Sequence, residues 1–137
     1  MKKILEVKDL TVGFAQNTGW HQVLNKISFD VNAGEIVGIV GESGSGKSMT
    51  ALAIMRLLAE NAHVTEGRIL FEGNDLLTCS ADQMRDIQGN DISMIFQEPM
   101  TSLNPVQKIG VQVGESLRLH TDLSKEEIEK RVLEALE

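Results

Sequence analysis

Apolar and polar positions alternate in two stretches near the start of the chain, residues 4–14 and 23–31. Partial alternation of this kind is typical of β-strands that bury one face. Residues 15–22 between them are mostly polar and include Gly19, which predicts a loop joining the two strands.

Two compact apolar runs, residues 36–40 and 92–96, indicate strands buried on both faces. A shorter strand is predicted at 68–72, between two glycines, and residues 49–58 read as a helix with a buried face. The order of these segments predicts a chain in which strands and helices alternate.

Two capping boxes indicate where further helices begin. Ser80 with Gln83 precedes a short polar helix, and Ser124 with Glu127 precedes a helix in which Ile128, Val132, Ala135 and Leu136 share one face. Two helices are expected to close the chain. The last has no glycine, asparagine or proline to end it, which fits a chain cut within a longer protein and fits equally a natural helix that frays.

The segment between the first buried run and the following helix, residues 41–48, has the pattern G-x-x-x-x-G-K-[ST]. Glycines let backbone N–H groups wrap closely around a polyphosphate. The helix start adds free N–H groups and a positive dipole end, Lys47 can reach the β and γ phosphates, and the Ser48 hydroxyl can bind Mg²⁺. The sequence therefore predicts a nucleoside triphosphate site with a strand before it and a helix after it.

Composition and charge limit the classes of function and cellular environment that fit this chain. The 137 residues are 42% hydrophobic and 4% aromatic. Their net charge of −7 argues against nonspecific electrostatic binding to nucleic acid or to an anionic membrane. Cys79 is the single cysteine, no secretory signal is evident, and no apolar run approaches the length of a membrane span. We expect a soluble protein of a reducing cytoplasm. His21, His63 and His120 lack metal-ligand spacing and are interpreted as ordinary surface or half-buried residues.

Two other nucleotide-binding classes fit less well. A small phosphate-loop kinase usually opens with the strand that leads into the loop, whereas two strands are predicted to precede it here. A GTPase motif D-x-x-G occurs at residues 86–89, but it follows a polar helix and has no N-K-x-D motif downstream. The kinase is kept as an alternative, and the D-x-x-G match is interpreted as coincidence.

The chain resembles the amino-terminal half of an ATP-binding subunit of an ABC transporter. The resemblance is carried by residues 34–48, Gly-Glu-Ile-Val-Gly-Ile-Val followed by the phosphate loop, and by residues 95–105, Ile-Phe-Gln-Glu-Pro-Met-Thr-Ser-Leu-Asn-Pro. The second string looks like the dipeptide, oligopeptide and nickel importer branch. Lys47 and Gln97 lie 50 positions apart, a spacing that suits the family's Q-loop.

The resemblance implies an α/β fold: a P-loop NTPase core of ABC type with an antiparallel β layer and the start of a helical subdomain, apparently truncated. The β layer would be residues 1–35, the core up to the Q-loop residues 36–105, and the helical start residues 106–137. The implied cofactors are ATP and Mg²⁺. Gln97 would be the Q-loop glutamine, which with Lys47 would act in catalysis and with Ser48 would bind Mg²⁺. The predicted nucleotide-binding residues are Phe14, Gly41, Ser43, Gly44, Ser45, Gly46, Lys47, Ser48 and Met49.

Phe14 occupies the place where the family carries an aromatic residue that stacks on adenine, usually tyrosine, and Trp20 nearby is expected at the surface. The parent protein would couple ATP hydrolysis to uptake of peptides or a related small solute. Its implied partners are transmembrane permease subunits, a second ATPase subunit and, indirectly, an extracytoplasmic solute-binding protein. It would lie on the inner face of the cell membrane. The signature motif, the Asp-Glu strand and the histidine loop of the family do not occur in these residues, so a nucleotide-binding fragment without turnover is the second hypothesis.

Overall fold

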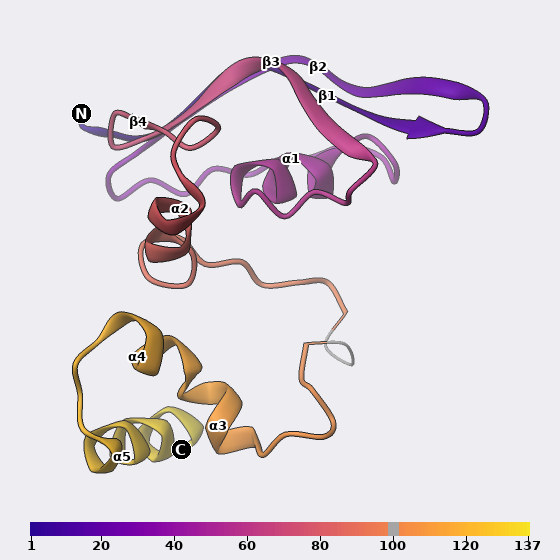
Figure 1. Ribbon diagram of the computed structural model, residues 1–137. Helices are drawn as coiled ribbons and strands as arrows, with labels where there is room; N and C mark the ends of the chain where they lie inside the picture. Colours follow the sequence, from indigo (N-terminus) through magenta and orange to yellow (C-terminus); the bar gives the residue numbers. More distant parts are fainter. Residues whose placement is uncertain (99–101) are drawn as a thin grey trace. The chain divides into compact units, whose positions relative to one another are not determined.

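A computed structural model describes residues 1–98 and 102–137, and the chain separates into two units, residues 1–84 and 85–137 (Figure 1). The first unit contains the sheet with one helix packed on it, a further helix crosses the boundary at residue 84, and the described part of the second unit contains an irregular segment followed by helices. The strands are β1 (Lys3–Gln16), β2 (Gly19–Asn32), β3 (Ala62–Phe71) and β4 (Asn74–Asp75). The helices are α1 (Lys47–Ile54), α2 (Ala81–Ile87), α3 (Ile109–Val113), α4 (Glu115–His120) and α5 (Lys125–Leu136).

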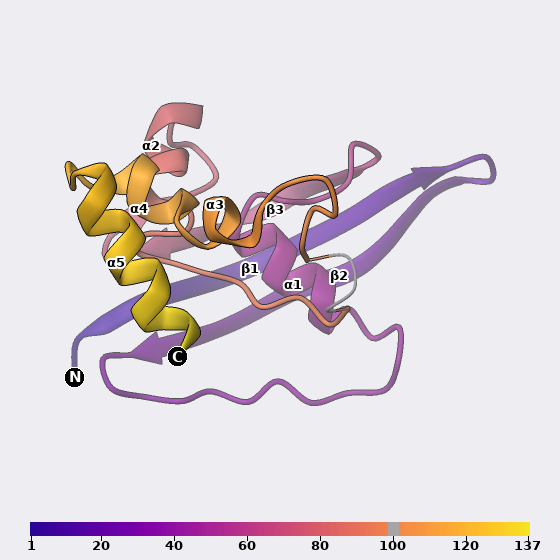
Figure 2. The ribbon, with the colours of Figure 1, turned by 90° about the horizontal axis from the view of Figure 1, so that it is seen from below.

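The sheet of the first unit is antiparallel throughout, with the strand order β2-β1-β3-β4. β1 and β2 form one long ribbon whose tip extends past the end of α1 in both views (Figures 1 and 2). At the opposite end of the ribbon the Lys3 ammonium lies 2.8 Å from the Asp30 carboxylate, and this hydrogen bond raises the pKa of Lys3.

The predicted loop at residues 15–22 is wrong, because pairing continues almost to the turn. Ala15 pairs with Trp20 and Gln16 with Gly19, which leaves only Asn17 and Thr18 between the strands. Gly19 has a φ of +117°, a value that favours glycine at such a turn. Both faces of the ribbon are exposed near its tip. Because neither face is buried there, apolar and polar residues need not alternate, and the sequence carries no strand pattern.

α1 lies along one face of the sheet and closes the core of the first unit (Figure 1). It ends at Ile54, earlier than the predicted Leu58, and Arg56 beyond it has a left-handed φ of 54°. The Arg56 guanidinium donates to the carbonyl oxygen of Cys79 at 2.8 Å, which ties this turn to the segment after β4. The largest fully buried side chains of this core are Val7, Leu10, Val12, Ile69 and Leu76.

The two predicted buried strands at 36–40 and 92–96 are wrong for this structure. No regular strand forms at either place, and Ile36, Val40 and Ile95 are at least 95% exposed. A strand of this apolar kind needs hydrogen-bonding neighbours and cover on both faces. None of the described strands pairs with either segment. The predicted strand at 68–72 does form and is longer, because β3 begins at Ala62 and pairs with β1 along its length.

Both capping boxes are confirmed. The Ser80 hydroxyl accepts from the Gln83 N–H at 3.1 Å, and the Gln83 side chain accepts from the Ser80 N–H at 2.9 Å. Ser124 and Glu127 make the same reciprocal bonds at the start of α5. Within residues 102–137 there are three helices rather than two, because the chain breaks at Gly114.

The second unit is held together by the apolar face of α5. Ile128 and Val132 are buried there, as the spacing predicts, whereas Leu136 is 57% exposed. A Cβ at Gly114 would lie 3.1 Å from methyl groups of both buried residues, so the chain between α3 and α4 approaches α5 closely because this position lacks a side chain. Among the described residues no helix is long and apolar enough to cross a bilayer.

Candidate nucleotide-binding site

The Lys47 ammonium lies in the centre of a loop formed by residues 41–46. It donates to the carbonyl oxygens of Gly41 at 2.6 Å and Glu42 at 2.8 Å, and to the Ser45 hydroxyl at 3.3 Å. The Ser45 N–H in turn donates to the Glu42 carbonyl at 3.1 Å. The loop therefore curls around its own lysine, and a phosphate group of higher negative charge can replace these carbonyl acceptors.

Two of the loop glycines are required by conformation. Gly44 and Gly46 have φ values of +81° and +98°, which side chains of L-residues rarely adopt. At Gly46 an added Cβ would also lie 2.5 Å from Leu24 Cδ2, whereas at Gly44 nothing lies within 4 Å. A Cβ at Gly41 would meet the Ser45 hydroxyl at 2.6 Å, so all three glycines serve the shape that the motif predicts.

The first turn of α1 presents its backbone N–H groups next to this loop. Among the described residues no side chain caps them and no acidic side chain lies in the turn. Free N–H groups and the positive helix end favour an anion here. Ser48 in this turn is exposed and its hydroxyl has no described protein partner, which fits a ligand for Mg²⁺, a cation that takes oxygen ligands. The predicted residues Ser43 and Ser45 are exposed, and Met49 is half-buried.

The sheet packs against the loop at Gly46. Gly46 contacts the side chains of Leu24 and Val23 on β2, and Leu24 pairs with Val12 on β1. Phe14 follows two residues later on β1, and the β1–β3 pairing is regular between the two positions, so Phe14 lies on the same face as Val12. The structure thus places the predicted base-stacking residue on the face of the sheet that carries the phosphate loop.

Trp20 lies on the opposite face. Its indole covers Gly13, where an added Cβ would lie 2.6 Å from the ring, and it stacks on His63 with centroids 6.3 Å apart and planes 8° apart. Trp20 is 47% exposed, in keeping with a surface aromatic.

Gln97 lies in an exposed, irregular segment of the second unit, and its role at Mg²⁺ and water stays a prediction. Residues 99–101 of the predicted Q-loop lie outside the described residues. Among the described residues, no group of three or more His, Cys, Asp or Glu could hold a metal ion.

Sequence reasoning missed the residues that support the site. Thr50 is buried, and its hydroxyl donates to the Gly46 carbonyl at 2.9 Å, which fixes the start of α1. Val23 and Leu24 hold Gly46 in place, and His21 pairs with Phe14. Strand register brings these side chains together, and register is not visible in a motif.

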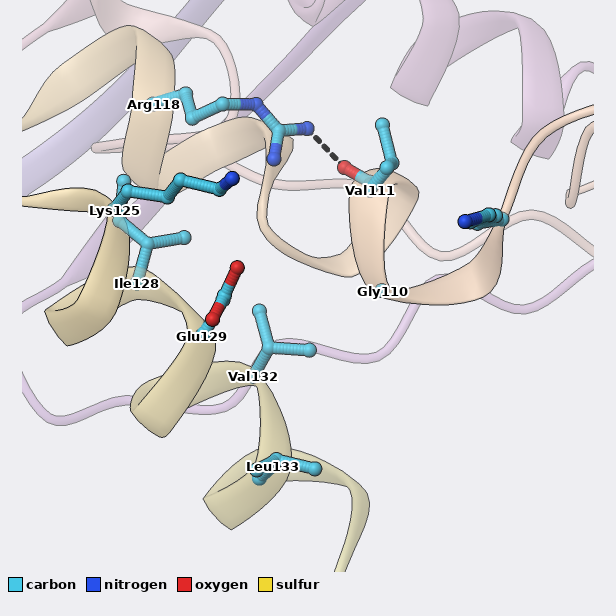
Figure 3. Close-up of a pocket in the computed structure, with 9 residues that line it drawn as sticks. Gly110, Val111, Arg118, Lys125, Ile128, Glu129, Val132 and Leu133 are labelled. Atoms are coloured by element: carbon cyan, nitrogen blue, oxygen red, sulfur yellow. Dashed lines mark hydrogen bonds between the residues drawn. The ribbon is translucent and has the colours of Figure 1, made fainter.

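The second unit contains a cavity of about 740 Å³ between α3, α4 and α5 (Figure 3). Ile128, Val132 and Leu133 of α5 line it, and the Arg118 guanidinium donates to the Val111 carbonyl across its upper edge. Lys108, Lys125 and Glu129 complete the charged part of the lining. No predicted nucleotide-binding residue belongs to this cavity.

Comparison with known proteins assigns the fold. Residues 24–137 match the profile of the family described as ABC transporter. This chain belongs to the ABC transporter family. The chain is similar to a solved dimeric bacterial ABC transporter cassette, with a TM-score of 0.82 and 27% identity over 96% of this chain and 55% of that one. A post-hydrolysis ATP-binding cassette dimer bound to ADP and Pi gives a TM-score of 0.80 at 26% identity, again over 96% and 55%. The predicted fold class is confirmed.

Curated relatives place the chain within the family. It is 47% identical to an oligopeptide transport ATP-binding protein of Bacillus subtilis over 98% of this chain and 38% of the relative. It is 50% identical to a dipeptide transport ATP-binding protein of the same organism and 46% identical to one of Lactococcus lactis, each over 99% of this chain. It covers 41% and 39% of those two relatives, so the chain spans about two fifths of the length of the relatives it matches.

Proposed function

We propose that this chain binds the triphosphate of ATP at residues 41–48. The observation that carries the proposal is the loop curled around the Lys47 ammonium at the uncapped start of α1. The Lys47 ammonium lies in the same first turn as the uncapped N–H groups and the positive dipole end of α1, and a polyphosphate is a ligand that uses all three.

The protein that carries this chain then uses ATP to drive uptake of peptides or a related small solute. Support comes from the relatives whose names specify oligopeptide and dipeptide transport. A second ATPase subunit is supported by the dimeric form of the similar cassettes. Permease subunits and, indirectly, an extracytoplasmic solute-binding protein complete the proposed assembly, with this subunit on the inner face of the cell membrane.

In this function each residue has a separate task. Lys47 neutralises the β and γ phosphates, and the backbone N–H groups of the loop orient them. Ser48 would supply a hydroxyl oxygen to Mg²⁺, and a bound ion would supply neutralisation of charge on the transferred phosphoryl group. The Gln97 amide oxygen orients the attacking water by accepting a hydrogen bond from it.

The second candidate function is nucleotide binding without turnover by these residues alone. It is favoured by the absence of the family's Asp-Glu strand and histidine loop from the 137 residues. In this candidate function the 137 residues hold nucleotide, or contribute half of a site, and do not turn it over.

The decisive experiment measures ATP binding and phosphate release on the full-length protein and its Lys47→Ala variant. We expect the variant to lose about 10-fold or more in ATP affinity, since a charge-assisted contact is worth about 1.5–3 kcal/mol. Lys130→Ala, which removes an exposed lysine of α5, is the matched control and should bind normally.

Binding and turnover by the wild type, both lost in Lys47→Ala, supports the transport ATPase. ATP affinity equal in the wild type and Lys47→Ala contradicts both candidate functions. Applied to the isolated 137 residues, binding without phosphate release identifies the second candidate.

A further inference from the structure

The side chain of Gln112, on α3, binds the backbone of the segment that precedes this helix. Its Oε1 atom accepts from the Asn104 N–H at 2.7 Å, and its Nε2 atom donates to the Asn104 carbonyl at 2.8 Å and to the Gln107 carbonyl at 3.0 Å. Asn104 is therefore paired through both of its backbone groups, as residues of neighbouring strands are in a sheet. One half-buried side chain thus holds a residue eight positions earlier in the chain.

Residues 104–107 form a turn that owes little to apolar packing. The Gln107 N–H donates to the Asn104 carbonyl at 3.3 Å, and the Val106 N–H donates to the Asn104 side chain at 3.0 Å. Pro105 occupies the second position of this turn, where its fixed φ is favourable. All four residues are exposed, Val106 by 87%. Because the turn buries little apolar surface, its position relative to α3 depends on the three hydrogen bonds from Gln112.

The turn lies close along the chain to the predicted catalytic glutamine. Asn104 follows Gln97 by seven residues, whereas α3 begins only at Ile109, twelve residues after Gln97. All of these residues belong to the second unit. The number of positions open to a residue rises with about the 3/2 power of its distance along the chain from a fixed point. Fixing Asn104 therefore makes any one position of Gln97 about 2-fold more probable than fixing the chain only at α3.

We propose that Gln112 is a positioning residue for Gln97, whose place beside the attacking water it favours by fixing the turn at 104–107. This inference rests on the proposed function, in which the Gln97 amide orients that water. ATP binding at residues 41–48 needs neither glutamine, because the groups proposed to hold the phosphates are Lys47 and backbone N–H groups. Loss of Gln112 should therefore slow turnover and leave ATP affinity unchanged.

The turn itself supplies a matched control. Gln107 is an exposed glutamine whose described hydrogen bonds use only its backbone N–H and carbonyl. Gln107→Met removes a glutamine side chain from the turn without changing the bonds from Gln112. Gln112→Met is the corresponding test variant, because methionine is similarly long and flexible but cannot replace the three bonds.

The test measures ATP affinity by calorimetric titration and kcat by phosphate release, both on the full-length protein. For Gln112→Met we expect kcat to fall about 2- to 5-fold, where the lower value is the effect of the longer segment and the upper value is the loss of one net hydrogen bond. ATP affinity should change by less than about 2-fold, and Gln107→Met should leave both quantities unchanged. In a Gln97→Ala background, Gln112→Met should lower kcat no further, because the residue through which it acts is absent.

A parallel fall of kcat and ATP affinity in Gln112→Met would mean that Gln112 supports the fold and not Gln97, and would overturn the inference. So would an unchanged kcat in Gln112→Met, or an equal further loss of kcat in the Gln97→Ala background. Failure of the proposed function looks different, because the wild-type protein would then neither bind ATP nor release phosphate from it.

Discussion

At the scale of single residues, the phosphate loop depends on glycines for two separable reasons. Gly44 and Gly46 both have left-handed φ values. Only at Gly46 would an added Cβ also overlap a neighbouring side chain, that of Leu24. The motif specifies glycine at position 46 and leaves position 44 open, whereas the contact with β2 follows from tertiary structure. A comparison of substitutions at the two positions therefore distinguishes the cost of backbone strain from the cost of steric overlap.

Gly46→Ala is expected to destabilise the protein more than Gly44→Ala. Left-handed backbone costs about 1–2 kcal/mol for a residue with a Cβ, and this applies to both variants. Gly46→Ala adds an overlap with Leu24 Cδ2 at 2.5 Å, which moves the start of α1 and weakens ATP binding. Thermal unfolding and ATP titration of the two variants side by side would measure this difference, and equal melting temperatures would contradict it.

At the scale of elements, close contacts decide how helices of the second unit pack. Gly110 lies within α3 and Gly114 follows it as the helix ends. A Cβ at Gly110 would lie 3.9 Å from Val132, an ordinary contact, whereas at Gly114 it would lie 3.1 Å from both Ile128 and Val132. Neither position has a positive φ, so packing alone distinguishes them.

The same substitution at these two glycines should therefore have opposite effects. Gly114→Ala overfills the contact with α5 and should destabilise the protein by about 1 kcal/mol or more. Gly110→Ala replaces glycine inside a helix without a clash and should stabilise it by about 0.5–1 kcal/mol. Chemical denaturation of both variants checks the sign of each change, and a stabilising Gly114→Ala would show that α5 yields to the added methyl.

At the scale of the whole molecule, the apolar runs at 36–40 and 92–96 belong to none of the described strands. Ile36 and Val40 flank the approach to the phosphate loop and are 98% and 95% exposed, and Ile95 is 98% exposed. Exposed strand-forming segments with unpaired backbone groups are templates for association.

We therefore expect the 137 residues expressed by themselves to self-associate or to fold only in part. Gel filtration should show species larger than a monomer, and a dye that binds exposed apolar surface should fluoresce. Replacing Ile36 and Ile95 by lysine should reduce the association. A single monomeric peak with a sharp cooperative melt would refute this expectation.

Local sequence determined the parts of this protein that depend on a few neighbouring residues. The phosphate loop, both capping boxes and the buried face of α5 follow from short patterns, since turns, caps and helical faces are formed within about one to four residues. The family resemblance likewise rests on short strings and is confirmed.

Tertiary structure alone decided the rest. The extent of the β1/β2 ribbon, the contact of Gly46 with Leu24 and the pairing of Phe14 with His21 depend on register between distant segments. The apolar runs at 36–40 and 92–96 have strand composition but no strand, because a strand exists only through the partners that share its hydrogen bonds. An apolar sequence pattern indicates that a segment is able to form a strand, and the presence of hydrogen-bonding neighbours decides whether the strand forms.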